Sequence, residues 1–499
     1  MRATFRHVCH CLRAPRKVVK ERQSIELEAH ADSDEDVERK GARRRCCVIQ
    51  DCAAYFQSSA VEELGGSGVP AAIFNLANTI IGASITGLPF VASTSGIVPF
   101  LIFLTISALL GYATLCMLVT AASYVPDGKK DYQVVGNLAL GPSGLKITAA
   151  ATCLSCYGAL TSYFVLVGTT APSICKALEL ALAPWKLQAF AALAVLWPLC
   201  ALRDISALAP ASLFALTVYS LLALTSVSAL VLKDDFYTSD VGRSYNITQD
   251  LGAAKWFPDK FGFDEISKFP TIVMAFTCQY ALLPILANVR SGSSEDMRKV
   301  CAGGMGAAYL VYALVAVCAY LAYEGHTRDM VLLNFRHCYR KECAAPGTPV
   351  GLCGRAELLE LCEDGNAFIT LLSGLSLLAV LLGYPCTHFA LRRAQLALLF
   401  GVDFAFSWPW HYGLAALNIG LTLSVALFVG SKISVVFNWS GAVAGPLISF
   451  ILPSLFYFRI LGKSGWPLAS PQRLAGLAGL ACGCFVMCLG IACNLLAER

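Results

Sequence analysis

Charged residues are scarce in this chain of 499 residues: Asp, Glu, Lys and Arg make up 14% of it, whereas 57% is hydrophobic. A soluble globular protein has about 25% charged residues, so this chain has too few to cover a water-exposed surface. The net charge of +5 is small and no basic patch alternates with aromatics, which excludes nucleic acid as a partner. The composition predicts a polytopic membrane protein in a lipid bilayer.

The sequence also lacks the short motifs of common enzyme and channel classes. No H-E-x-x-H or P-loop occurs. The segment Gly82-Ala-Ser-Ile-Thr86 departs from the G-x-S-x-G nucleophile elbow at its last position. Charge rings and repeated filter carbonyls, which are typical of ion channels, are missing as well. We therefore expect neither an enzyme nor a channel.

Eleven apolar stretches are each about long enough to cross a bilayer as a helix, which takes about 20 residues. They are 70–91, 96–121, 146–174, 186–202, 205–232, 266–288, 301–323, 366–390, 412–431, 433–458 and 473–496. We predict an all-α polytopic membrane protein with 11 transmembrane helices, in a domain of residues 69–497. Residues 1–68 are predicted to form a cytosolic, disordered tail, and no apolar segment typical of a cleaved signal peptide follows its basic start.

The basic residues predict an orientation in the membrane. Loops on the side of the tail are rich in Lys and Arg, among them Lys129, Arg392 and Arg393, whereas the short loops opposite hold few. The positive-inside rule then places the N-terminus in the cytosol and the C-terminus outside it. The plasma membrane and a vacuolar or lysosomal membrane both remain open.

Two long loops on the side opposite the tail agree with this orientation. Asn246 begins an Asn-Ile-Thr glycosylation sequon in loop 233–265. An even number of cysteines in the polar loop 324–365 indicates two disulfides in an oxidising compartment, with three pairings open. These four cysteines are Cys338, Cys343, Cys353 and Cys362.

The first apolar stretch contains residues that break helices. It reads FNLANTIIGASITGLPF from Phe74 to Phe90. A broken helix at membrane depth is tolerated only where it is buried in protein or lines a cavity. In transporters with inverted repeats, such breaks bind an anionic group and a cation. The sixth stretch has a similar polar run before Leu-Pro, at 276–284. We predict a five-plus-five inverted repeat with broken helices 1 and 6; the alternative is small residues that merely permit close helix packing.

Four segments also resemble, in the same order, motifs of the sodium-coupled neutral amino acid transporters, a branch of the amino acid/auxin permease superfamily. Besides 74–90 they are TIVMAFTCQYALLPILANV, GYPCTHFALRRAQLALLFG and GAVAGPLISFILPSLFYFRI, which resemble parts of helices 6, 8 and 10. The eleventh-type branch is nearest, because it shares Tyr-Pro in helix 8 and Gly-Leu-Pro in helix 1. The resemblance implies secondary active symport of neutral L-amino acids by alternating access.

The resemblance also implies roles for residues at the two breaks. Asn78 aligns with an Asn whose side chain binds sodium in the family. Ala83 and Ser84 replace the usual Ser-Gly, and Gln279 replaces a common His. The positions that match substrate-binding residues are Gly82, Ala83, Ser84, Ile85, Ser162, Tyr163, Phe276, Thr277 and Cys278.

One departure from the family leaves the coupling ion open. The family has a Thr, a second sodium ligand, just before the helix-8 proline, where this chain reads Leu381-Leu-Gly-Tyr-Pro385. Ser376 or Ser373, one or two turns earlier, is the alternative source of this hydroxyl. The apolar stretches hold few carboxylates or histidines for a proton; His388, near the expected cytosolic end of helix 8, is one candidate. Sodium and protons therefore stay open, and no other cofactor is expected. The rival function is an amino acid sensor that signals through the cytosolic tail with little transport.

Overall fold

The computed structural model describes residues 68–125, 131–177, 182–202, 209–231, 254–258, 268–287, 293–334, 367–401, 407–430 and 433–497, with a few isolated positions between them. The predicted tail at 1–67, the sequon at Asn246 and the loop cysteines Cys338, Cys343, Cys353 and Cys362 lie outside the described residues. The cysteines that the structure does describe form no disulfide with one another.

The regular secondary structure of the described residues is helical. In the first half it comprises α4 (Val69–Ile81), the 3₁₀ turn η1 (Ala83–Thr86), α5 (Leu88–Ser95), α6 (Ile97–Ala122), α7 (Tyr132–Leu140), α8 (Pro142–Ala177), α9 (Pro184–Phe190), η2 (Ala191–Leu196), α10 (Trp197–Ala201) and α11 (Ala209–Val231). The second half comprises α15 (Phe269–Ala275), α16 (Gln279–Leu286), α17 (Ser294–Tyr323), η4 (Glu324–His326), α18 (Val331–Asn334), α21 (Ala367–Phe400), α22 (Trp408–Val429), α23 (Ile433–Pro446), the π-helical turn η6 (Leu447–Ile451), α24 (Leu452–Lys463) and α25 (Pro471–Ala497).

Nine helical segments within the described ranges are long and apolar enough to cross a membrane. Helix α4 is a shorter apolar helix that continues, after a break, into α5. Large apolar side chains on the outer faces of these helices are exposed, as Phe428 on α22 is at 93%, which fits a surface solvated by lipid tails. The all-helical membrane fold is thus confirmed, whereas the number of eleven crossings and the inverted repeat stay predictions.

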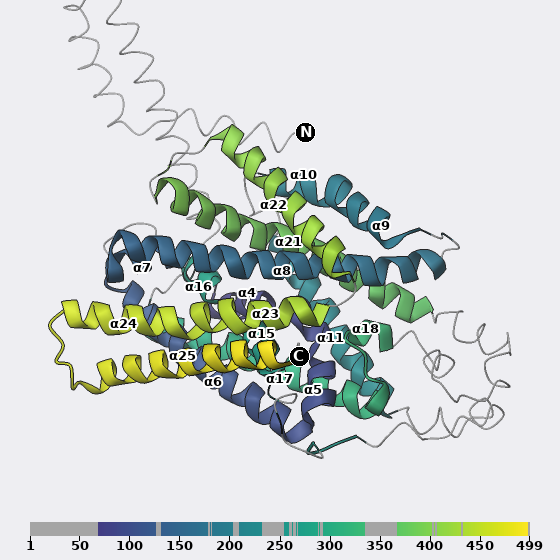
Figure 1. The fold of residues 1–499 in the computed structure, drawn as a ribbon, viewed down its shortest axis with the longest axis horizontal. Helices are drawn as coiled ribbons and strands as arrows, with labels where there is room; N and C mark the ends of the chain where they lie inside the picture. Colours follow the sequence, from purple (N-terminus) through teal and green to yellow (C-terminus); the bar gives the residue numbers. More distant parts are fainter. Residues whose placement is uncertain are drawn as a thin grey trace, which may run out of the picture. The chain divides into compact units, whose positions relative to one another are not determined.

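Helix α8 is the centre of the arrangement. It runs between α21 on one side and α23 on the other, and it also contacts α7, α9 and α22 (Figure 1). Helix α17 packs against α4, α5, α6 and α11. The helices around α8 and the helices around α17 meet at two places. Helix α11 contacts both α17 and α21, and η1 contacts α8, α15 and α17.

The structure corrects two expectations about the loops. Helix α7 occupies 132–140, where no helix was predicted, and it packs against α8 and α24. Helix α21 continues through Pro385 to Phe400, so Arg392 and Arg393 lie in a helix and not in a loop. Arg392 is buried, and its Nη1 donates to the Cys200 carbonyl at 3.3 Å. The guanidinium therefore has a protein partner, whereas a loop position would have left it in water.

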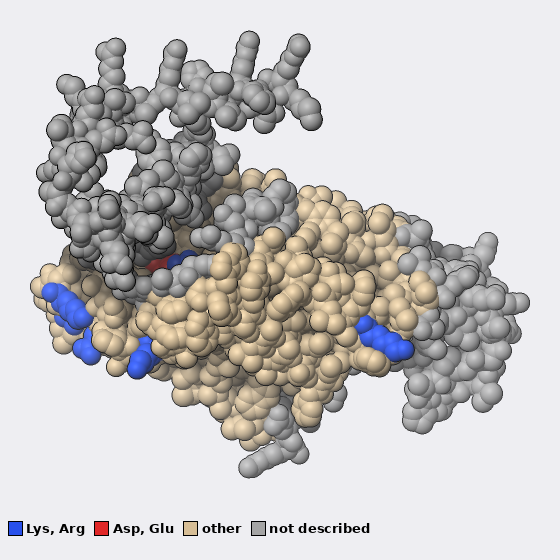
Figure 2. All heavy atoms as spheres, turned by 90° about the horizontal axis from the view of Figure 1, so that it is seen from above, with Lys and Arg blue, Asp and Glu red and all other residues tan. Residues whose placement is uncertain are grey.

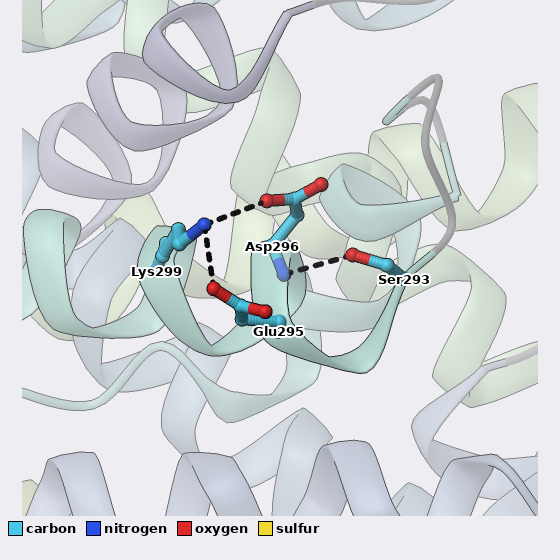
Figure 3. A network of polar contacts seen from close by, with 4 residues as sticks. All are labelled: Ser293, Glu295, Asp296 and Lys299. Carbon is cyan, nitrogen blue, oxygen red and sulfur yellow. Dashed lines mark hydrogen bonds and ion pairs between the residues drawn. The ribbon is translucent and has the colours of Figure 1, made fainter.

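Charged side chains at the start of α17 form local contacts with one another (Figure 3). The backbone N–H of Asp296 donates to the Ser293 hydroxyl at 3.1 Å, an N-cap that satisfies one of the first amides of the helix. Lys299 Nζ lies 2.9 Å from Glu295 and 3.3 Å from Asp296. Exposed pairs of this kind stabilise a helix by only about 0.3–0.5 kcal/mol.

The face of the molecule drawn in Figure 2 shows few Lys, Arg, Asp or Glu atoms among the described residues.

Candidate functional site

The first helix breaks at a glycine. Helix α4 ends at Ile81, and Gly82 follows with φ 38° and ψ −147° before η1 and α5. A residue with a Cβ rarely adopts a positive φ, so this turn requires glycine. Pro89 then stands in the first turn of α5, where its missing N–H is tolerated. The break therefore follows from local sequence, as predicted.

The sixth helix breaks between α15 and α16. Phe276, Thr277 and Cys278 separate the two pieces, and Cys278 is the N-cap of α16 with φ −140° and ψ 2°. The N–H of Cys278 donates to Oε1 of Gln279 at 3.0 Å. The Ser449 hydroxyl in η6 lies 3.0 Å from the same Oε1 and 3.1 Å from the Thr277 hydroxyl. A buried polar network thus holds the second break against the π-helical turn of the tenth span.

A tyrosine of α17 links the two breaks. The Tyr312 hydroxyl lies 2.7 Å from the carbonyl of Ile80, 3.0 Å from that of Ile81 and 3.0 Å from that of Ala275. Tyr312 is fully buried, and its ring meets Phe276 edge-on at 5.4 Å between centroids. Carbonyls freed by both breaks therefore converge on one donor.

Both breaks border one cavity of about 570 Å³. This volume lies within the range of about 300–1,000 Å³ that is usual for ligand pockets. Of the predicted substrate-binding residues, six line the cavity: Gly82, Ala83, Ser84, Ser162, Tyr163 and Thr277. Ile85, Phe276 and Cys278 are buried and are not part of its lining. The substrate-binding role of all nine stays a prediction.

The cavity lining mixes apolar and polar side chains and is nearly uncharged. Its charged members are Asp131, which precedes α7, and Arg393 of α21, and these two form an ion pair. The lining residues of the first helix are small, hydroxyl, amide or aliphatic, and none of them is charged. A ligand at the break thus meets hydrogen-bonding groups without a net charge.

Asn78 has an unpaired oxygen in the cavity wall. Its Oδ1 is buried and has no hydrogen-bond partner, and the residue lines the cavity. A buried amide oxygen without a donor is destabilising by about 1–3 kcal/mol, so a ligand that supplies positive charge would relieve it. Within the described residues, no group of three or more His, Cys, Asp or Glu side chains is arranged to hold a metal ion.

Gly383 of α21 lines the same cavity and leaves open space beside it. A Cβ added to it would meet no atom within 4 Å. It is one of the candidate positions before Pro385 where the resemblance implies a threonine hydroxyl. The structure therefore offers a free side-chain oxygen at Asn78 but no hydroxyl at Gly383.

His388 lies inside α21 and not at a boundary. It is buried, its ring stacks on Tyr384 at 6.3 Å, and its Nε2 lies 3.4 Å from Nδ2 of Asn418. Asn418 belongs to a network with Tyr157 and Gln395, at 2.7–2.9 Å. His388 is not part of the cavity lining. Its buried position is accounted for by its contact with this network.

Several residues of the cavity lining were not predicted from the sequence. They are polar or aromatic and comprise Asn75, Thr79, Gln133, Thr152, Tyr219, Tyr280 and Thr387. Asn75 and Thr79 could have been found, because residues three, four and seven apart share a helix face with Asn78 and Gly82. Gln133 and Tyr280 enter through tertiary packing and carry no such signal.

Comparisons with known proteins agree with this architecture. A family model described as "Transmembrane amino acid transporter protein" matches residues 65–340 and 356–495. A nucleobase-cation-symport-1 family transporter, solved in a closed conformation with bromovinylhydantoin bound, is similar with a TM-score of 0.51 and 13% identity, over 87% of this chain and 93% of its own. A mutant manganese transporter of Eremococcus coleocola is similar with a TM-score of 0.50 and 11% identity, over 86% and 94%.

The structural likeness at these identities shows a shared fold alone, whereas the family match spans most of the chain. The family match confirms the resemblance at the level of the amino acid/auxin permease superfamily, and with it the expectation that the protein is not an enzyme. The chain belongs to the transmembrane amino acid transporter family and is a multi-pass membrane protein.

Proposed function

We propose that this protein is a secondary active transporter of neutral L-amino acids, of the sodium-coupled neutral branch of its family. The observation that carries the proposal is the convergence of two broken helices on one nearly uncharged cavity. Breaks of this kind expose backbone amides and carbonyls at mid-membrane. An amino acid presents the matching pair of groups, a carboxylate and an ammonium.

The substrate carboxylate binds at the first break in this proposal. The first N–H groups of a helix have no acceptor within the helix, and in η1 these belong to Ala83–Ile85. Such amides attract an anion. The ammonium then faces the carbonyls and hydroxyls of the opposite wall, including Thr277 and Ser162. The absence of charged residues near the break, within the described lining, favours a neutral substrate side chain.

Sodium is the coupling ion that Asn78 favours. Its free Oδ1 is a hard oxygen ligand for a cation but not a proton acceptor at ordinary pH. The remaining ligands would be backbone carbonyls of the broken first helix, because Gly383 supplies no hydroxyl. We therefore propose coupling to sodium with a weaker site than one completed by a helix-8 Thr, and the competing proposal is proton coupling.

Access alternates by a rocking motion in this proposal. Spans 1, 2, 6 and 7 move as a bundle against the scaffold of spans 3, 4, 8 and 9. The packing supports such a division, because α17 contacts α4, α5 and α6, whereas α8 contacts α21, α22 and α9. The N-terminus lies in the cytosol and the C-terminus outside it, in the plasma membrane or a vacuolar or lysosomal membrane.

Uptake by the purified full chain in liposomes tests the function. A labelled mixture of neutral L-amino acids is offered with an inward sodium gradient, with an inward proton gradient, and with neither. Uptake driven by sodium alone is the expected result. Uptake driven by protons alone would show that the coupling ion is the proton and that Asn78 does not bind it. Binding without uptake or counterflow would favour the sensor with its cytosolic tail.

Ser84→Trp tests the position of the site. The indole would fill the cavity beside the break, so we expect uptake to be lost while expression and unfolding temperature are kept. Ser220→Trp is the matched control, because Ser220 is exposed on α11 and lies outside the cavity lining. Normal uptake by Ser84→Trp would show that the substrate binds elsewhere.

A further inference from the structure

The cavity extends well beyond the helix breaks. Its lining residues on α21 run from Ala379 to Arg393, which is about 21 Å along a helix at about 1.5 Å per residue. The level of the first break is marked by Tyr163, whose hydroxyl lies beside Gly82 and whose ring meets Tyr384 at 6.2 Å. Arg393 comes nine residues after Tyr384, about 13 Å further along α21.

An ion pair lies at this far end of the cavity. Arg393 donates from Nη2 to Oδ2 of Asp131. The two residues come from different elements, since Asp131 is the N-cap residue of α7 and Arg393 lies in α21. Their side chains are 18% and 38% exposed, so the pair is partly hydrated. Breaking such a pair is costly only when a charge is left without a partner, so a ligand that supplies both opposite charges can open it.

The chemistry of the pair matches that of a zwitterion. A guanidinium binds a carboxylate through two parallel N–H donors, and a carboxylate accepts hydrogen bonds from an ammonium. A free amino acid carries both groups on one carbon. If it inserts between Asp131 and Arg393, each protein charge exchanges one partner for another and none is left unpaired. Gln133, two residues after Asp131 in α7, lines the same cavity and adds a polar amide to its wall.

We propose that Asp131 and Arg393 form a second binding site for zwitterionic α-amino acids at the end of the cavity, where the ion pair opens to admit the substrate. This inference rests on the proposed function. The carboxylate of the amino acid pairs with Arg393 and its ammonium with Asp131. Under the proposed orientation this second site lies on the cytosolic side of the helix breaks.

Binding stoichiometry tests the second site. Equilibrium dialysis of the purified full chain measures bound labelled L-alanine and L-leucine up to millimolar concentrations. We expect two molecules per wild-type protein, one per Ser84→Trp protein and one per Asp131→Asn/Arg393→Gln protein. The matched control is Glu295→Gln/Lys299→Gln, which removes an ion pair of α17 outside the cavity lining (Figure 3) and should still bind two.

Each result separates this proposal from the proposed function. One molecule bound by the wild type, and one by Asp131→Asn/Arg393→Gln, would overturn the second site and leave the transporter proposal standing. No binding by any variant would contradict the proposed function as well. If the double variant does not fold, Arg393→Lys replaces it, because Lys keeps the charge and loses the planar fork. Its affinity at the second site should fall about tenfold with the unfolding temperature unchanged; unchanged affinity would contradict the proposal.

Competition on Ser84→Trp protein identifies the groups that the second site recognises. Unlabelled L-alanine should displace the remaining labelled amino acid. Propionate, which lacks the ammonium, and L-alanine amide, which lacks the carboxylate, should compete at least about tenfold more weakly. Equal competition by either analogue would show that the site does not read both charges and would overturn the proposal.

Discussion

The Tyr312 hydroxyl lies 2.7 Å from the carbonyl oxygen of Ile80, at the end of the first half of the broken first helix. The same hydroxyl reaches the carbonyl of Ala275 at 3.0 Å, at the end of α15. One side chain of α17 thus bridges the two discontinuities that border the cavity. A hydroxyl has a single proton, so it satisfies one of these carbonyls at a time, and the others retain their capacity to accept.

Tyr312→Phe should weaken the link between the breaks without opening a cavity. The buried carbonyls would lose their donor, which we expect to lower the free energy of unfolding by about 1–3 kcal/mol and to slow uptake. Thermal unfolding and initial uptake rates measure both. Tyr309→Phe is the control on the same helix, because its hydroxyl contacts Thr105 at 3.1 Å and not a break. Equal effects of the two variants would mean that Tyr312 is no more than a packing residue.

Gly82→Ala should strain the first break. Alanine at φ 38° is disfavoured by about 1–3 kcal/mol, although its Cβ would meet no atom closer than Tyr163 Oη at 3.7 Å. We expect a lower unfolding temperature and reduced uptake.

Gly413→Ala in α22, where a Cβ meets nothing within 4 Å, should instead leave uptake unchanged and stabilise by about 0.5–1 kcal/mol. If Gly82→Ala behaves like this control, the backbone at Gly82 is not required for the site.

The sequence predicted what depends on local chemistry. Gly82 and Pro89 determine the first break by themselves, since one permits a positive φ and the other cannot donate within a helix. The apolar stretches likewise predicted the membrane helices by length. The same residues did not reveal which side chains face the cavity, because ring packing such as that of Tyr163 on Tyr384 arises only when α8 meets α21.

Tertiary contacts overrode the sequence signals at α7 and at the end of α21. Two adjacent arginines normally indicate a loop at a membrane surface, but Arg392 is buried beside the Cys200 carbonyl and His411 Nε2, each at 3.3 Å. Helix α7 is too short to stand out in a hydropathy pattern. Its Gly136 packs so closely against α8 that an added Cβ would lie 2.9 Å from the Gly144 carbonyl oxygen. Neither feature can be read from one segment alone.

Gln279→Leu should detach the second break from η6. The Cys278 N–H and the Ser449 hydroxyl would lose their shared acceptor, so we expect unfolding to become easier by about 1–3 kcal/mol and the KM for uptake to rise. The control is Gln395→Leu, which disrupts the network of Tyr157 and Asn418 outside the cavity. It should lower stability with KM unchanged. A shift in KM for both variants, or for neither, would remove Gln279 from the site.

Gly383→Thr should strengthen sodium coupling. The position lines the cavity in the middle of α21, and an added Cβ would meet no atom within 4 Å, so the first atom of a new side chain displaces no neighbour. Its hydroxyl would add one oxygen ligand to the cation that Asn78 is proposed to bind. A hydrogen bond or ligand contact to a charged group contributes about 1.5 kcal/mol, which is about tenfold in affinity.

The measurement is the sodium concentration that gives half-maximal uptake in liposomes. It should fall about tenfold in Gly383→Thr, whereas Gly383→Val, which has nearly the same shape without the hydroxyl, should leave it unchanged. Because the two variants differ by one oxygen, an equal shift in both would trace the effect to the shape of the side chain. An unchanged sodium dependence in Gly383→Thr would instead place the cation away from α21, and uptake that follows the proton gradient in every variant would exclude Asn78 as the coupling ligand.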